Sequence, residues 1–166
     1  MAKNDKKAAT ARSAAVEILQ QVLGEGAYTN IAVNKYLRSH ELSDMDRRLM
    51  TELVYGTVKA VGTIDWYLQQ CVTRPLDKID KLVLSILRIS VYQLLYMDKI
   101  PASAACNEAV NLARLFSHEG TAKFVNGVLR GLLRKKDSFT FPDKEKETAD
   151  YISLAMYHPR WLVRSE

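Results

Sequence analysis

The sequence contains few cysteines, glycines and prolines, and it has no long apolar run. Its two cysteines, Cys71 and Cys106, stand far apart without the spacing of metal ligands, which argues against a disulfide framework and against a zinc site. We interpret both as buried thiols of a reduced chain. No apolar segment is long enough to cross a bilayer, and the lysine-rich N-terminus lacks the apolar stretch of a signal peptide. These absences predict a soluble, cytoplasmic protein with no membrane partner.

Sequence motifs of catalysis are also missing. There is no P-loop, no Rossmann glycine fingerprint and no cluster of histidines or cysteines with metal-ligand spacing. His40, His118 and His158 fall at expected loops or helix ends without a nucleophile or ligand partner, so a structural role is favoured for them. Asp44 and Asp46 resemble a carboxylate pair, but helix capping explains them more simply. We therefore predict no catalytic, cofactor-binding or metal-binding residue in this chain.

The overall composition is that of a globular helical protein. Apolar residues make up 48% and charged residues 26% of the 166 residues, which argues against disorder. This length allows one well-buried core but not a full catalytic domain beside it, so we expect one domain with tails. The 24 Lys and Arg residues outnumber the 19 Asp and Glu residues, and the isoelectric point is near 9.2. That excess favours a polyanionic partner without identifying one.

Apolar residues recur every three to four positions along most of the chain, and no stretch alternates with period two for long enough to be a strand. The fold class is therefore all-α, a bundle of about seven helices plus a trailing one. Segment 77–97 is apolar nearly all round and belongs at the centre. Four hydroxyl side chains are expected to cap helices, namely Thr29, Ser43, Thr63 and Ser103. The expected helices cover residues 8–23, 29–37, 43–58, 63–71, 77–97, 103–116, 120–136 and 146–157.

Basic residues gather in two places. Residues 1–7 form the first, a basic flexible arm with Lys3, Lys6 and Lys7, and Arg12 continues its charge. The second is one face of segment 120–136. That face carries Lys123, Arg130 and Arg134.

Two glycines, Gly127 and Gly131, share this basic face. In a helix interior each costs about 1 kcal/mol relative to alanine, so close backbone approach of a partner is the expected gain. The partner is either another helix or a phosphate group, and the residues alone leave both readings open.

Two further arginines, Arg47 and Arg88, are embedded in apolar helical turns. We expect them to be structural and paired with acids such as Glu52, Glu108 or Asp65.

Aromatic platforms for single-stranded RNA need exposed rings among basic residues. Tyr28, Tyr36, Tyr55 and Trp66 instead lie at helical core spacing. The residues by themselves therefore indicate a basic helical bundle that binds an acidic partner.

Several stretches in series resemble the NusB fold family. They are DRRLMTELVYGTVK at 46–59, the Ile64 and Asp65 pair, LSILRISVYQLLYMDKIPASAACNEAVNLAR at 84–114, and KFVNGVLRGLL at 123–133. The resemblance covers most of residues 8–136 and implies a NusB-type bundle there. Because such bundles bind RNA in that family, it also implies that the basic face meets nucleic acid.

The tail carries a second resemblance. HPRWLV at 158–163 is similar to the leader that joins a NusB-like domain to the catalytic region in the RsmB (Sun/Fmu) family of S-adenosylmethionine-dependent methyltransferases, which act on carbon 5 of a cytosine in small-subunit ribosomal RNA. Residues 137–166 then hold a linker, a helix and the start of that leader. The partners implied are small-subunit ribosomal RNA and the chain's own C-terminal methyltransferase domain. S-adenosylmethionine is implied for the parent enzyme and no cofactor for this piece, which lacks the family's proline–cysteine nucleophile.

The resemblance implies a docking role for the cations of both basic regions. The RNA-binding residues predicted in this way are Lys3, Lys6, Lys7, Arg12, Lys123, Arg130 and Arg134. The alternative is a NusB-type transcription antitermination factor that binds RNA and a ribosomal protein. A reading frame that continues past Glu166 favours the enzyme, and a stop codon there favours the antitermination factor. A helical protein-interaction bundle without RNA is the third reading.

Overall fold

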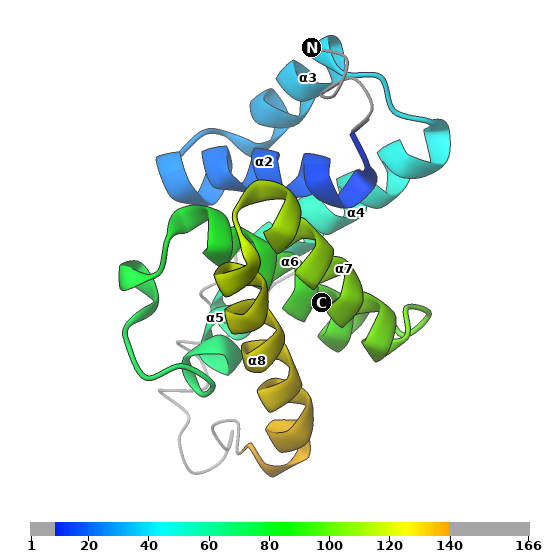
Figure 1. Ribbon diagram of the computed structural model, residues 1–166. Coiled ribbons are helices and arrows are strands. Elements are labelled where there is room, and N and C mark those ends of the chain that lie inside the picture. Colours follow the sequence, from blue (N-terminus) through cyan, green and yellow to red (C-terminus); the bar gives the residue numbers. More distant parts are fainter. Residues whose placement is uncertain (1–8, 140–166) are drawn as a thin grey trace, which may run out of the picture.

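The computed structural model describes residues 9–139, and all regular structure within them is helical. No strand occurs in this range, which confirms the all-α prediction. Seven α-helices follow one another (Figure 1): α2 (Ala11–Glu25), α3 (Thr29–Ser39), α4 (Asp44–Lys59), α5 (Val61–Gln69), α6 (Lys81–Tyr96), α7 (Ala102–Phe116) and α8 (Glu119–Lys135). There are also two short 3-10 turns in this range: η1 (Leu76–Lys78) precedes α6, and η2 (Lys136–Ser138) follows α8. The predicted arm 1–7 and the trailing helix 146–157 lie outside the described residues.

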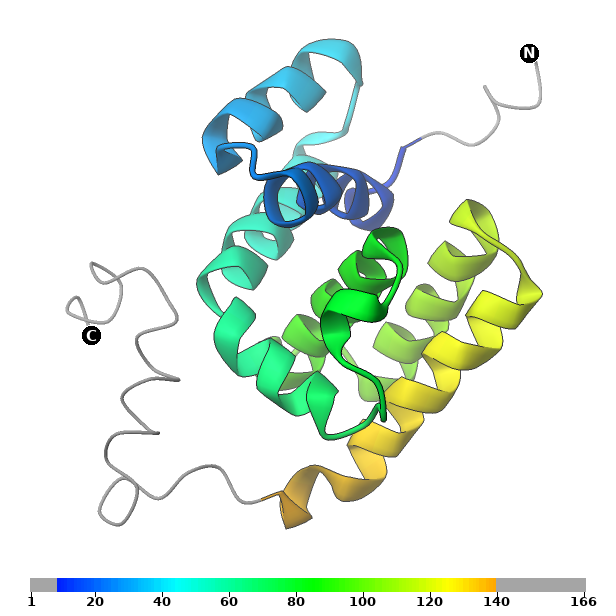
Figure 2. The same cartoon turned by 90° about the vertical axis from the view of Figure 1, so that its left-hand side faces the viewer.

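Helix α6 is the centre of the bundle, as its all-round apolar sequence predicts. It contacts α2, α4, α5, α7 and α8. Figure 2 shows α7 and α8 as a hairpin on one side of α6, with α2 and α3 at the end of the molecule that is uppermost in Figure 1. The fold therefore exposes the outer faces of α7 and α8 while α6 fixes their inner faces.

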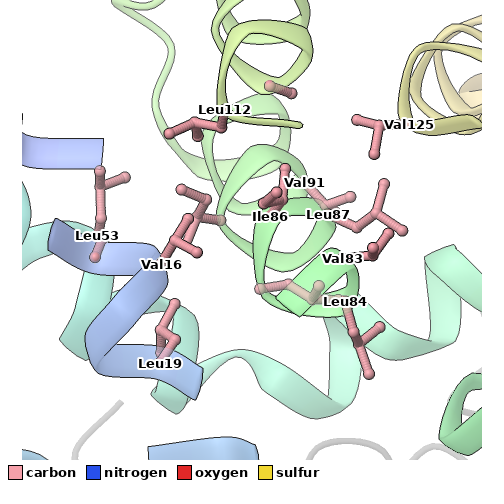
Figure 3. Close-up of a cluster of buried hydrophobic side chains, with 14 of the residues drawn as sticks. Val16, Leu19, Leu53, Val83, Leu84, Ile86, Leu87, Val91, Leu112 and Val125 are labelled. Carbon is pink, nitrogen blue, oxygen red and sulfur yellow. The ribbon is translucent and has the colours of Figure 1, made fainter. Parts of the chain in front are cut away.

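One apolar core joins these helices (Figure 3). Leu19 of α2, Leu53 of α4, Leu87 of α6 and Val125 of α8 are all fully buried within it, and Leu112 of α7 is buried beside them. Burying one such side chain contributes about 1.5–3 kcal/mol. A shared core of this kind holds α7 and α8 at a fixed position relative to the other helices.

Helix starts agree with the predictions only in part. The Ser43 hydroxyl accepts a hydrogen bond from the Asp46 amide at 3.1 Å and caps α4, as predicted. The prediction for Thr29 is wrong, because Thr29 is the first residue of α3 and the residue before it makes no side-chain cap. Ser103 is likewise inside α7, which starts directly after Pro101. Proline pre-sets the backbone there and needs no capping hydroxyl beside it.

The predicted cap at Thr63 is also wrong. Helix α5 begins at Val61, so Thr63 lies within its first turn. Ala60 ends α4 and begins α5 at once, and it is buried. The two helices therefore follow each other with one buried residue between them.

The two arginines expected to be structural behave differently. Arg88 of α6 forms a bidentate ion pair with Asp65 of α5, as predicted. Its Nε donates to Oδ1 at 2.9 Å and its Nη2 donates to Oδ2 at 2.7 Å. Arg47 instead lies near Asp44 at 3.5 Å, and both side chains are exposed. The prediction of an embedded, structural Arg47 is wrong because its side of α4 faces solvent.

Of the aromatic side chains expected in the core, some are buried and others are exposed. Tyr36 is buried, but Tyr28, at the start of α3, is 76% exposed, so its core assignment is wrong. Trp66 lies against the ring of Phe139, which brings the end of the described chain onto α5.

Candidate nucleic-acid interface

Helix α8 presents an apolar stripe inward and a basic stripe outward. Val125, Leu129 and Leu132 are fully buried against α6 and α7. Lys123 and Arg134 are exposed on the other side, and Arg130 is half-buried between them. The amphipathic pattern of the sequence thus predicts both faces correctly.

A groove of about 310 Å³ runs between α7 and α8 beside this basic stripe. Its wall from α7 consists of Asn107, Val110 and Arg114, and its wall from α8 consists of Glu119, Ala122, Lys123, Asn126 and Arg130. The structure therefore brings the predicted Lys123 and Arg130 into one site. Arg134 lies one turn beyond Arg130 and does not line the groove.

The Arg130 side chain is held in place within the groove. Its Nε donates a hydrogen bond to Oδ1 of Asn126, one turn earlier on α8, at 3.3 Å. This bond uses the amide oxygen of Asn126 and leaves its NH₂ group available as a donor. The NH₂ group of Asn126 and the guanidinium of Arg130 are adjacent hydrogen-bond donors, an arrangement that suits an anion.

An ion pair closes one end of the groove. Arg114 of α7 donates from Nε to Oε1 of Glu119 at 2.8 Å and from Nη2 to Oε2 at 3.1 Å. The side chains are 54% and 56% exposed. The hydrogen bond from Arg114 lowers the pKa of Glu119, and the same bond raises the pKa of Arg114.

Sequence reasoning missed Arg114, Glu119 and Asn107 as members of this site. Asn107 and Arg114 are seven residues apart and so share one exposed face of α7, which is a readable signal. The pairing of Arg114 with Glu119 was harder to find. It depends on how the turn between α7 and α8 folds back, and spacing along one helix does not give that.

Arg12 belongs to the helical bundle and not to the arm with which the sequence grouped it. It lies in the first turn of α2, where its Nε donates to Oε1 of Gln93 at 2.9 Å. Gln93 is almost fully buried in α6, so this bond ties α2 to the centre of the fold. Only the remaining guanidinium nitrogens are left for a phosphate. Lys3, Lys6 and Lys7 lie outside the described residues.

The two glycines of the basic face have different surroundings. A side-chain carbon added at Gly127 would meet no atom within 4 Å among the described residues, and Gly127 is exposed. Gly131 is buried, and an added carbon would lie 3.7 Å from Nη2 of Arg134. No helix in the described range therefore requires the glycine at position 127, and its bare backbone is open to a partner.

The other candidate groups have structural roles. His118 accepts a hydrogen bond from the Gly120 amide and caps α8, and His40 stacks on Tyr36 with ring centroids 3.8 Å apart. Both cysteines are free. Cys106 is buried and Cys71 only half-buried, and burial raises the pKa of each thiol, which disfavours the reactive thiolate.

A Rossmann-type domain holds a nucleotide-type cofactor on a strand followed by a glycine-rich loop and a helix. Residues 9–139 contain no strand, and Gly26 is the one glycine there with a positive φ. None of the helices described is long and apolar enough to span a membrane.

Comparisons with known proteins identify relatives of two kinds. The sequence profile of the NusB family matches residues 9–134. The "Probable ribosomal RNA small subunit methyltransferase B" of Bacillus subtilis is 38% identical over 159 residues, which are 95% of this chain and 35% of that protein. The "Transcription antitermination protein NusB" of Ruminiclostridium cellulolyticum is 33% identical over 119 residues, which are 71% of this chain and 82% of that protein. The chain thus spans about a third of the length of the methyltransferase relatives it matches.

The fold has solved counterparts. A structure described as antitermination factors NusB and NusE in complex with dsRNA gives a TM-score of 0.67 at 21% identity. The match covers 75% of this chain and 93% of that one. At this level of identity the likeness shows a common helical architecture and nothing about the site.

Proposed function

Because the chain belongs to the NusB family, we propose that its helical bundle docks small-subunit ribosomal RNA. The observation that carries the proposal is the α7–α8 groove, where Lys123 and Arg130 converge from a stripe that continues to Arg134. Contacts from such cations to phosphates fix the register and orientation of RNA without reading its bases. The arm residues Lys3, Lys6 and Lys7, with Arg12, are proposed as additional contacts.

We further propose that the docking serves a methyltransferase of which this chain is the N-terminal part. The 38% identical relative matches 95% of the chain and extends well beyond it, whereas the NusB relative matches 71%. S-adenosylmethionine, the cytosine-C5 transfer and the contact with a catalytic domain then belong to the remainder of the protein, which acts in the cytoplasm. Antitermination activity is the alternative.

Salt-dependent RNA binding tests the docking proposal. If about three cations touch phosphates, log K should fall with log salt with a slope of about −2, since each contact on a single strand contributes about 0.7. The double variant Arg130→Glu/Arg134→Glu should weaken binding to all RNA sequences and flatten the slope. Both residues lie away from the apolar stripe, so the helical circular dichroism should not change.

A matched control makes the same charge change elsewhere. Lys35 and Arg38 are exposed on α3, outside the groove, so Lys35→Glu/Arg38→Glu should reduce affinity less. Equal losses in the two double variants would show that net charge alone drives binding. Unchanged binding in the α8 variant would reject this face as the docking site.

Methyl transfer tests the assignment of catalysis to the remainder of the protein. The isolated chain, incubated with labelled S-adenosylmethionine and unmethylated small-subunit RNA, should incorporate no label. A longer reading frame that includes residues beyond Glu166 should restore incorporation. Label transferred by the pure chain itself would contradict the proposal.

A further inference from the structure

The α7–α8 groove contains three cationic side chains, and one of them is already paired with a carboxylate. Arg114, Lys123 and Arg130 line it together with a single acid, Glu119. Glu119 accepts hydrogen bonds from two of the five N–H donors of Arg114 in a bidentate ion pair. A cation that faces a binding groove is thus neutralised by a residue of the same groove.

We infer that Glu119 is a built-in competitor for RNA and that Arg114 is a masked phosphate-binding residue, released when an RNA phosphate takes the place of the carboxylate. This inference rests on the proposed docking function and adds two residues to it. Arg114 then becomes a third groove cation beside Lys123 and Arg130.

The geometry of the pair makes this exchange possible. A guanidinium presents the same planar fork to a carboxylate and to a phosphate, so one replaces the other without rotation of the arginine. More than half of each side chain is exposed, and an exposed pair is weak because water already solvates both charges. A phosphate that is also held by neighbouring cations is the stronger ligand.

The ionised carboxylate of Glu119 remains stabilised after Arg114 leaves it. It is the first residue of α8, where the positive end of the helix dipole favours a negative charge. Lys123, one turn later, also favours its ionised form. The carboxylate therefore remains charged and continues to compete for Arg114.

The size and lining of the groove specify what part of the RNA it takes. A volume of about 310 Å³ lies at the lower limit of ligand pockets, which is enough for one phosphate with its ribose. Amide groups of Asn107 and Asn126 add neutral hydrogen-bond donors, and no aromatic ring lines the groove for base stacking. The site therefore recognises the sugar–phosphate backbone of RNA and not its bases.

A double-mutant cycle in the 166-residue chain tests the competitor, with a single-stranded RNA oligonucleotide as the probe. Glu119→Gln should tighten binding by about threefold, within the range of one exposed ion pair. In the Arg114→Gln background the same change should give almost no gain. Arg114→Gln should also cost more affinity when Glu119 is absent than when it is present, because only then is Arg114 free for RNA.

Glu108→Gln is the matched control for charge. Glu108 is exposed on α7 but does not line the groove, so its loss should leave affinity nearly unchanged. A gain from Glu119→Gln that persists without Arg114, or an equal gain from Glu108→Gln, would overturn the inference. RNA binding that responds to the α8 reversal but shows no coupling in the cycle would overturn the inference alone. A chain that binds no RNA would overturn the docking function as well.

Discussion

Two arginines of this bundle each form a bidentate ion pair with a carboxylate, but the two pairs differ in how far they are exposed to solvent. Arg88 and Asp65 join α6 to α5 with side chains 14% and 18% exposed. Arg114 and Glu119 join α7 to α8 with side chains more than half exposed. The pair near the centre is largely shielded from water, whereas the pair at the groove is in contact with it.

Glycines show the same contrast between the interior and the exposed face of α8. Gly56 of α4 lies so close to Tyr92 of α6 that an added side-chain carbon would overlap the tyrosine ring. Gly127 of α8 has open space instead. Position in the bundle therefore decides whether an ion pair or a glycine supports the fold or remains free to meet a partner.

Removing the charge of Arg88 should have the largest effect on stability. Arg88→Met keeps most of the stem but leaves the Asp65 carboxylate poorly solvated, so we expect a loss of about 2–3 kcal/mol in the free energy of unfolding by urea, below the value for fully buried pairs. Arg114→Met should leave the urea midpoint almost unchanged.

The double variant Arg88→Met/Asp65→Asn provides the control, because it removes both charges and should regain part of the lost stability. If Arg114→Met destabilises the protein as much as Arg88→Met, the contrast between the two pairs is wrong.

Gly56→Ala should have the next largest effect. Overpacking costs about 1–3 kcal/mol, and the better helix propensity of alanine returns up to about 1 kcal/mol, so a net loss of about 1–2 kcal/mol is expected in thermal or urea unfolding. Adding Tyr92→Leu should relieve the overlap and reduce the loss. A stabilised Gly56→Ala variant would show that Tyr92 moves aside at no cost.

Gly127→Ala should act in the opposite direction. With open space around the added carbon, the variant should be more stable by about 1 kcal/mol. If an RNA backbone approaches α8 at this point, the same variant should bind RNA more weakly while unfolding at a higher temperature. Higher stability with unchanged affinity would show that the RNA backbone does not approach α8 at this position.

The smallest effect concerns the pH dependence of the exposed pair. Its hydrogen bond from Arg114 lowers the pKa of Glu119, so the stabilisation is present above the ordinary carboxyl pKa and is lost as pH falls through the lowered value. The difference in Tm between the wild type and Glu119→Gln should therefore be larger at about pH 7 than at about pH 3. A difference that does not vary with pH would contradict a role for the pair in the folded state.

The helices were predictable because each buries one continuous stripe, and the centre was predictable because segment 77–97 has apolar residues all round. The pairing of Arg88 with an acid followed from the cost of an unpaired charge in such a segment. Helix starts were less predictable. A hydroxyl near a helix start signals a cap only if the chain turns there, and at Thr29 and Ser103 the turn occurs one or more residues earlier.

The site was predictable only along a single helix. Lys123 and Arg130 share a face of α8 and could be assigned to one surface from spacing alone. Arg114 and Asn107 join them through the packing of α7 on α8, which is a tertiary contact. Arg12 was misplaced for a similar reason, because its partner Gln93 is 81 residues away in the chain.

That separation also sets an order of events during synthesis. Helices α2 and α4 leave the ribosome before α6, although their apolar faces are buried against it. At about 5–20 residues per second, the stretch from Lys59 to Tyr96 takes roughly 2–7 s to appear. Throughout that interval the nascent chain exposes its unfilled core to water. The central helix that completes the core is therefore synthesised after two of the helices that pack on it. Until it appears, the apolar faces of α2 and α4 are exposed surface of the kind that chaperones bind.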